Sequence, residues 1–197
     1  MATSPEVKRI PLGSGKLYVT EFTGEVKTAI TNIKTLIEKV ETDANELGRV
    51  SGGASLEYKA EFYTAEDDLG TVSRTIMTTD EATLKGGICT WNGATLQKLC
   101  STARVTEDAT NNLRVVKIGG VKNYDGKLYA IMFVNDDTEF GKTYVIIVGN
   151  NQAGFTFEFL KDKETVINPE FKAMSADSDG TKVIYAETLD PTKTVTK

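Results

Sequence analysis

Alternating apolar and polar positions predict β-strands in the first half of the chain. The runs at 16–22 (KLYVTEF) and 56–63 (LEYKAEFY) alternate in this way, which is the period of a strand with one buried face. In the second run we expect one face to lie in the core and the other to carry charges: Leu56, Tyr58, Ala60 and Phe62 against Glu57, Lys59 and Glu61. A turn cluster at 66–70 and a β-rich run at 71–78 complete a predicted hairpin.

The second half of the chain is predicted to be almost entirely strands. Turn residues separate six further runs of strand length: 113–118, 128–135, 143–149, 155–160, 171–176 and 182–188. In one of these runs the aromatic side chains Phe155, Phe157 and Phe159 form an apolar face, with Thr156 and Glu158 opposite. Because strands dominate and do not alternate with helices, we expect a mainly β fold. It would be a β-sandwich or partial barrel with one or two short flanking α-helices, in a single domain over 1–197.

Two short helices are predicted in the middle of the chain. The spacing from Thr78 to Glu81 is that of a capping box, and the residues 82–85 that follow end at a Gly-Gly pair. Asn92 is a candidate N-cap for a second helix at 93–101. Its core-facing side chains are expected to be Leu96, Leu99 and Cys100.

Residues 24–47 form a long insertion between two predicted strands. Spacings of four, three, four and three separate its apolar side chains, which is the rhythm of one helix face. They are Val26, Ile30, Ile33, Ile37 and Val40. The threonines of the same stretch also allow an extended arm with a short helical piece, so both conformations stay open. Insertions of this length in compact domains are often functional.

The composition excludes most catalytic chemistry. The chain has no histidine, which rules out Ser-His-Asp and Cys-His systems, histidine general bases and most zinc sites. Residues 13–16 (GSGK) resemble the end of a phosphate-binding loop, but the upstream glycine is missing and a strand follows. Residues 177–180 match a calcium loop only in part. We therefore expect no enzyme, no cofactor and no bound metal.

The cysteines, the N-terminus and the net charge indicate the cellular compartment and the kinds of partner to expect. Cys89 and Cys100 are too few for a disulfide-dependent secreted domain and are expected to be buried thiols in a reducing compartment. The N-terminus lacks a signal-peptide pattern, and no apolar run is long enough to span a membrane. The 23 Lys and Arg residues face 28 Asp and Glu residues, a net charge of −5, which argues against a basic nucleic-acid-binding stripe. The protein is expected in a cytoplasm, or released from one by lysis, without a membrane partner.

Four segments, taken in order, resemble the major tail protein (tail tube protein) of long-tailed bacteriophages and prophages of Gram-positive bacteria. They are GSGKLYVTEF at 13–22, NELGRVSGGASLEYKAEFYTAEDDLGTVSRT at 45–75, EATLKGGICTWNGATLQKLCSTARV at 81–105 and GFTFEFLKDKETVINPEFKAMSADSDGTKVIYAE at 154–187. The resemblance implies a tail-tube-type β-sandwich whose subunits form stacked hexameric rings around a channel for phage DNA. It also implies other tail proteins as partners, such as the tape measure and tail terminator proteins. The protein would lie in the virion after assembly in the host bacterial cytoplasm, and the resemblance brings no catalytic residue.

The resemblance suggests roles for two sets of residues. The hairpin 55–63/70–78 would line the channel, because acidic side chains repel DNA phosphates whereas lysines bind them. The candidate lumen-facing residues are Glu57, Lys59, Glu61 and Glu158, of which Lys59 argues against this role. The apolar stripe in 24–47 (Val26, Ile30, Ile33, Ile37 and Val40) is a candidate inter-subunit arm. The alternative is a stripe that packs on its own domain.

Two other functions fit the same pattern. A tube subunit of a contractile phage-like particle or a secretion system would share the fold and differ in its contacts with a sheath. A carbohydrate- or protein-binding β-sandwich would be a monomer with aromatic residues clustered at one loop end. Trp91 lies between two predicted helices and is expected in the core.

Overall fold

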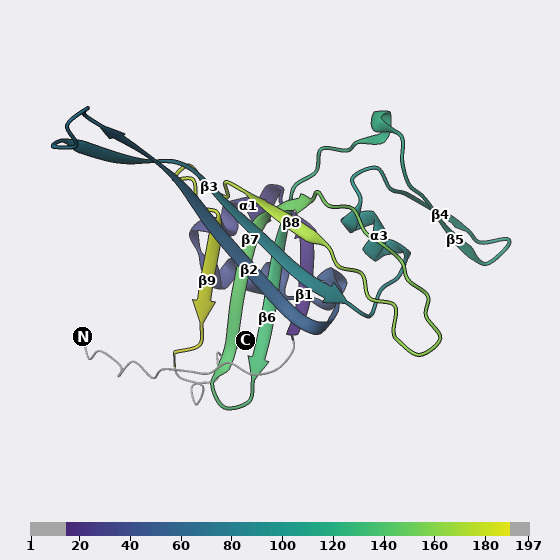
Figure 1. The fold of residues 1–197 in the computed structure, drawn as a ribbon. Helices are drawn as coiled ribbons and strands as arrows, with labels where there is room; N and C mark the ends of the chain where they lie inside the picture. The colour runs from purple at the N-terminus through teal and green to yellow at the C-terminus, as the bar shows by residue number, and fades with distance from the viewer. Residues whose placement is uncertain (1–14, 190–197) are drawn as a thin grey trace.

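A closed ring of antiparallel strands forms the body of the molecule. The computed structural model describes residues 15–189. In that part of the chain the main sheet has the order β6-β1-β2-β3-β8-β7-β9, and a further β6–β7 pairing closes it into a six-stranded barrel, with β9 attached to β7. Figure 1 shows this barrel with its helices and two outlying hairpins. The expected mainly β fold is confirmed.

The strands have the following bounds. They are β1 Gly15–Glu21, β2 Glu46–Glu66, β3 Ser73–Ile88, β4 Arg104–Asp108, β5 Leu113–Lys117, β6 Tyr129–Asp137, β7 Gly141–Asn151, β8 Glu170–Met174 and β9 Val183–Glu187. The α-helices are α1 Gly24–Thr28, α2 Ile33–Val40 and α3 Gly93–Leu99, and the 3₁₀ helices are η1 Ala29–Thr31, η2 Asp43–Asn45 and η3 Val121–Asn123. No helix in residues 15–189 is long and apolar enough to cross a membrane.

Strands β1, β6 and β7 are buried on both faces, which explains their continuous apolar runs. One set of alternate side chains fills the barrel, including Leu17, Ile131 and Ile147. The other set, including Met132 and Ile146, forms a second cluster outside the barrel. The interior cluster draws on all six strands of the ring and on α3. The barrel therefore has an apolar core inside and a second one beneath the helices of its outer face.

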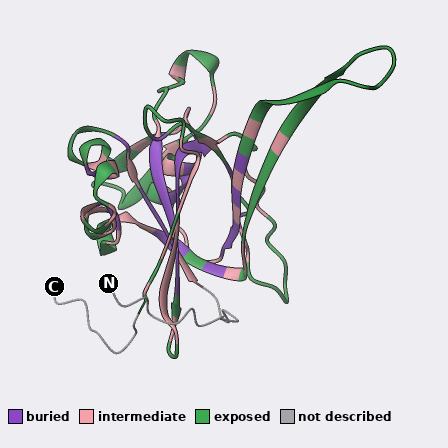
Figure 2. Cartoon of the chain, turned by 90° about the vertical axis from the view of Figure 1, so that its left-hand side faces the viewer, coloured by how far each residue is buried: buried purple, intermediate pink, exposed green. Residues whose placement is uncertain are grey.

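The insertion at 24–47 is helical and covers that outer face. Asn32 begins α2, because its side chain accepts a hydrogen bond from the Thr35 amide at 3.2 Å. Val40 is fully buried in the outer cluster, and Val26, Ile30 and Ile37 pack partly against it, while Ile33 is half-buried. Figure 2 shows the helices on one side of the barrel. The stripe thus packs on its own sheet in this structure, which is the alternative that the sequence left open.

The predicted helix at 82–85 is wrong, because β3 runs through it. Thr78 does not cap a helix here; its hydroxyl donates to the Glu61 carbonyl on the neighbouring strand at 3.1 Å. Residues 83–85 then pair with β2 on one side and β8 on the other. The helix after Asn92 is confirmed, since that side chain accepts from the Ala94 amide at 2.8 Å and α3 follows.

The remaining strand predictions are confirmed with one exception and one addition. Residues 155–160 form a loop rather than a strand. Phe155 and Phe157 of this loop pack against the interior cluster, and Phe157 stacks on Trp91 at 4.8 Å between ring centroids. β4 was not predicted and pairs with β5 in a separate two-stranded ribbon. The two cysteines are free and half-buried rather than buried.

Candidate assembly surface

The β2–β3 hairpin leaves the barrel and projects from it. Within residues 15–189, β2 pairs with β1 only through 46–49, and β3 pairs with β8 only through 83–85. Beyond those residues the two strands pair with each other alone as far as the Glu66–Ser73 pair. A strand of 21 residues is roughly 70 Å long at the usual rise per residue. Figure 1 shows the far half of the hairpin well outside the barrel.

A bulge at the base of the hairpin sets this direction. The pairing Val50↔Ile88 is followed by Ala54↔Gly86, so the intervening residues of β2 interrupt the ladder. Gly52 and Gly53 have φ angles of +80° and +86°, which lie in the left-handed region that glycine adopts without strain. Bulges bend a strand and increase its twist. This one redirects β2 away from the barrel.

One face of the projecting hairpin carries exposed apolar side chains, with the Asp80 carboxylate among them. The ladder places Tyr58 beside Ala82 and Phe62 beside Met77 on that face. Tyr58, Phe62 and Met77 are 54%, 64% and 55% exposed. The sequence pattern assigned Leu56, Tyr58 and Phe62 to the core, and this is wrong. The alternation is present, but beyond the end of the barrel none of residues 15–189 forms a second layer over this face.

The opposite face carries the predicted charges. Glu57, Lys59 and Glu61 lie on it together, and Lys59 Nζ lies 2.8 Å from Glu57 Oε1. The hydrogen bond from Lys59 lowers the pKa of the Glu57 carboxyl. Glu61 accepts from the Thr79 hydroxyl at 3.1 Å. Glu158 is exposed on the loop between β7 and β8, not on the hairpin.

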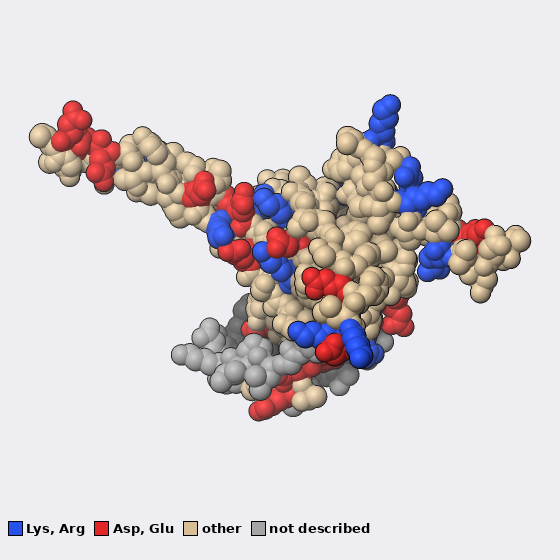
Figure 3. Space-filling model, turned by 45° about the vertical axis from the view of Figure 1, so that its right-hand side comes forward, with Lys and Arg blue, Asp and Glu red and all other residues tan. Residues whose placement is uncertain are grey.

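The hairpin also carries the net negative charge of the chain. Residues 55–82 contain seven Asp and Glu residues and two Lys and Arg residues, a net charge of −5 that equals the net charge of the whole chain. Figure 3 shows acidic side chains at the far end of the hairpin and a mixture of signs near its base. The rest of the chain has no net charge, so the net negative charge of the chain is concentrated on the hairpin.

The tip of the hairpin is ordered by its own hydrogen bonds. The Asp67 carboxylate accepts from the Val72 amide and from the Thr71 hydroxyl, each at 2.7 Å. These bonds lower the pKa of Asp67 and hold the turn in one shape. Leu69 and Val72 are 84% and 69% exposed there. The tip thus presents apolar side chains on a fixed turn.

Both outer edges of the hairpin are unpaired along most of their length. In the described part of the chain, no third strand pairs with 55–66 outside β3 or with 73–82 outside β2. Edges of this kind are templates for pairing with another chain, and a two-stranded ribbon alone is only marginally stable in water. Unpaired edges beside exposed apolar side chains make the hairpin a surface suited to contact with another protein molecule.

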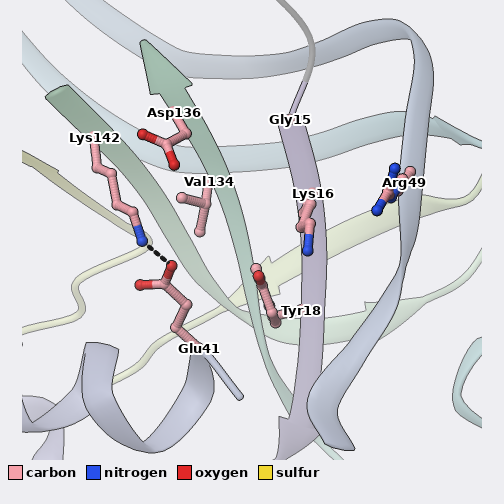
Figure 4. Close-up of a pocket in the computed structure, with 8 residues that line it drawn as sticks. All are labelled: Gly15, Lys16, Tyr18, Glu41, Arg49, Val134, Asp136 and Lys142. Carbon is pink, nitrogen blue, oxygen red and sulfur yellow. Dashed lines mark hydrogen bonds and ion pairs between the residues drawn. The ribbon is translucent and has the colours of Figure 1, made fainter. Parts of the chain in front are cut away.

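A cavity of about 450 Å³ opens beside β1, β6 and β7. Charged side chains line it: Lys16, Glu41, Arg49, Asp136 and Lys142. Figure 4 shows the Lys142–Glu41 ion pair at its rim, and Lys16 lies 2.8 Å from Glu46. Burial and the nearby Glu41 carboxylate raise the pKa of Tyr144 to about 12, so its phenol stays neutral beside the pair. These contacts tie the end of α2 to the barrel. No group of Cys, Asp and Glu in residues 15–189 is arranged to hold a metal ion.

The tip residues Leu69 and Val72 were not predicted from the sequence, whose helical spacing placed the candidate inter-subunit arm in 24–47. A signal was present in the length of the two strand patterns, because residues 46–66 and 73–88 form strands of 21 and 16 residues. Typical strands have about five or six residues. Strands this long exceed the body of a small domain and must project. The Gly-Gly pair at 52–53 interrupts the strand pattern of residues 46–66, so its full length is not evident from the sequence.

Comparisons with known proteins assign no family. No family model matches the chain, and no curated protein matches it. One of the solved structures that resembles it is a chain from the virion of a native gene transfer agent particle. It has a TM-score of 0.33 and 10% sequence identity, over 74% of this chain and 92% of that chain. A likeness this distant identifies neither the family nor the function of the present chain.

Proposed function

We propose that this protein is a structural subunit of a bacteriophage tail tube, in which copies of the chain assemble into stacked rings. The observation that carries the proposal is the projecting hairpin with unpaired edges and an exposed apolar face. On a monomer such a surface favours aggregation. Between copies it becomes the contact that holds the assembly together. The four sequence segments that resemble tail tube proteins support a tube as the proposed form of that assembly.

A ring and a tube follow from contacts between unlike surfaces. We propose that the hairpin contacts a different surface on a neighbouring copy, rather than the same hairpin of that copy. Contacts of this head-to-tail kind give a ring when the rotation closes and a filament when it does not. In the proposed tube, contacts of the first kind close each hexameric ring, and contacts of the second kind stack one ring on the next.

The charged face of the hairpin is the proposed lining of the DNA channel. Its residues Glu57 and Glu61 repel phosphates, and the attraction of Lys59 is offset by its ion pair with Glu57. A conduit needs weak binding, because each phosphate contact adds salt-dependent affinity and slows passage. Glu158, on its separate loop, is the fourth proposed lining residue.

The proposed role is structural rather than enzymatic, with no cofactor. The proposed partners are other copies of the chain and further tail proteins such as the tape measure and tail terminator proteins, with DNA only in transit. The proposed location is the virion, after assembly in the host bacterial cytoplasm. A tube of a contractile particle or a secretion system would use the same hairpin contacts and would differ in what surrounds the tube.

Electron microscopy of the purified full-length protein tests the proposal. Negative-stain images are expected to show rings or tubes of uniform bore, and sedimentation velocity is expected to show discrete large species that increase with protein concentration. A strict monomer at high concentration would contradict the proposal and would favour the ligand-binding β-sandwich instead.

A further inference from the structure

The two outlying ribbons of the molecule carry opposite charges. Residues 55–82 of the β2–β3 hairpin have a net charge of −5, whereas residues 98–124, which include β4 and β5, have five basic and two acidic side chains, a net charge of +3. Figure 1 shows the two ribbons on opposite sides of the barrel. Figure 3 shows basic side chains gathered on the β4–β5 side and acidic ones at the hairpin tip.

The acidic end of the hairpin is exposed, and two of its carboxylates have no ionic partner among the described residues. Glu66 ends β2 and Asp68 lies in the turn, and neither forms an ion pair with any of residues 15–189. Leu69 and Val72 lie beside them, mostly exposed. Asp67 is different, because its carboxylate is occupied by the Val72 amide and the Thr71 hydroxyl. The tip therefore offers two free carboxylates next to two apolar side chains.

The surface formed by β4, β5 and η3 is basic and therefore complements the acidic hairpin tip. Arg104 and Lys117 lie directly opposite each other on the ribbon, both exposed and without an ion pair in the described part of the chain. Like charges in this position are unfavourable in an isolated ribbon. Lys122, also exposed and unpaired there, follows on η3. Exposed apolar side chains accompany these cations: Leu113, Val115, Ile118, Val121 and Tyr124.

The β4–β5 surface is firmly placed on the molecule. The ribbon packs on α3, where a Cβ on Gly93 would lie 2.8 Å from Cδ of Arg114. The chain after β5 is held by a hydrogen bond from the Gly119 amide to the Thr102 hydroxyl at 3.1 Å. The Asn123 side chain donates to the Gly119 carbonyl at 2.8 Å. The backbone that carries these cations is therefore held in place by the rest of the molecule.

We infer that the hairpin tip of one copy docks on the β4–β5 surface of a second copy. The carboxylates of Glu66 and Asp68 meet the cations Arg104, Lys117 and Lys122, and Leu69 and Val72 meet the apolar side chains between those cations. Because the two surfaces lie on opposite sides of one chain, the contact joins different copies head to tail. The inference rests on the proposed self-assembly and identifies the surface that receives the hairpin.

Charge reversal in the full chain tests the contact. The variant E66K/D68K is expected to need at least about tenfold more protein to form particles than the unsubstituted chain, and so is R104E/K117E. An equimolar mixture of the two variants is expected to recover assembly, because each reversed tip finds a reversed receiving surface on the other variant. The control D179K/D162K reverses two exposed carboxylates away from both ribbons and is expected to assemble normally. Circular dichroism checks that each variant is folded.

The outcomes separate the contact from the proposed function. If the unsubstituted chain forms particles and both reversed variants do so equally well, the inferred contact is wrong and the proposed function stands. A mixture that fails to assemble although both variants are folded also overturns the contact. If the unsubstituted chain stays monomeric, the proposed function fails and the contact with it. Salt gives a test without substitutions, because raising NaCl from about 0.05 M to about 0.5 M should weaken assembly; unchanged assembly contradicts the contact.

Discussion

Replacing Tyr58, Phe62 and Met77 together by serine is expected to leave a folded monomer and to abolish assembly. All three side chains are more than half exposed on the apolar face of the hairpin, so the barrel loses little packing when they are removed. At a subunit contact each contributes about 1.5 kcal/mol of apolar burial. The combined loss of roughly 4.5 kcal/mol weakens each contact more than about a thousandfold. Sedimentation velocity measures the assembly, and thermal unfolding followed by circular dichroism measures the fold of the monomer.

A matched control removes exposed apolar side chains elsewhere. Leu160 and Met174 lie on the loop before β8 and on β8 itself, and both are exposed. Their joint replacement by serine is expected to leave assembly unchanged. Particles of normal size and yield from the hairpin variant would show that the apolar face of the hairpin is not an assembly contact.

Gly149→Val is expected to have the largest effect on the stability of the monomer. Gly149 pairs with Ala173 where β8 joins β7 and helps to close the barrel. A Cβ at this position would lie 1.9 Å from the carbonyl oxygen of Lys172. Since that oxygen belongs to the backbone of a paired strand, no rotamer change relieves the clash. Overpacking of this kind typically costs 1–3 kcal/mol and occasionally more, and we expect a loss of about 3 kcal/mol in the free energy of unfolding.

Urea unfolding of the two proteins measures this loss, and a second substitution serves as its control. Ala153→Val also adds a branched side chain, but on the exposed loop just after β7. It is expected to change the free energy of unfolding by less than about 0.5 kcal/mol. A Gly149→Val variant as stable as this control would mean that β7 and β8 do not approach each other closely enough to require glycine.

The parts of the fold that the sequence predicted are those with a local cause. Met132 and Ile146 belong to apolar runs long enough for a strand and short of a membrane span, and both runs are strands. Asn92 supplies two hydrogen bonds to the first turn of α3, so the start of that helix is encoded within a few residues. The spacing of Ile33, Ile37 and Val40 likewise indicated the face of α2.

The parts of the fold that could not be predicted depend on whether a distant segment of the chain covers a strand face or pairs with a strand edge. The alternation that includes Tyr58 and Phe62 indicates a strand with one apolar face, but it does not say whether the same chain covers that face. Thr78 and Glu81 have the spacing of a helix cap, yet the pairing of β3 with two distant strands outweighs it. The assembly surface was therefore visible as a pattern, and its exposure required the tertiary structure.

A density map of the assembled particle tests the central claim most directly, namely that the β2–β3 hairpin joins neighbouring subunits in a tube. We expect residues 55–82 of every subunit to lie against neighbouring copies, with their unpaired edges covered and with Glu57 and Glu61 facing the axis of the channel. A map in which the hairpins extend into solvent, while other surfaces join the subunits and Glu57 and Glu61 lie on the outside of the tube, would contradict it.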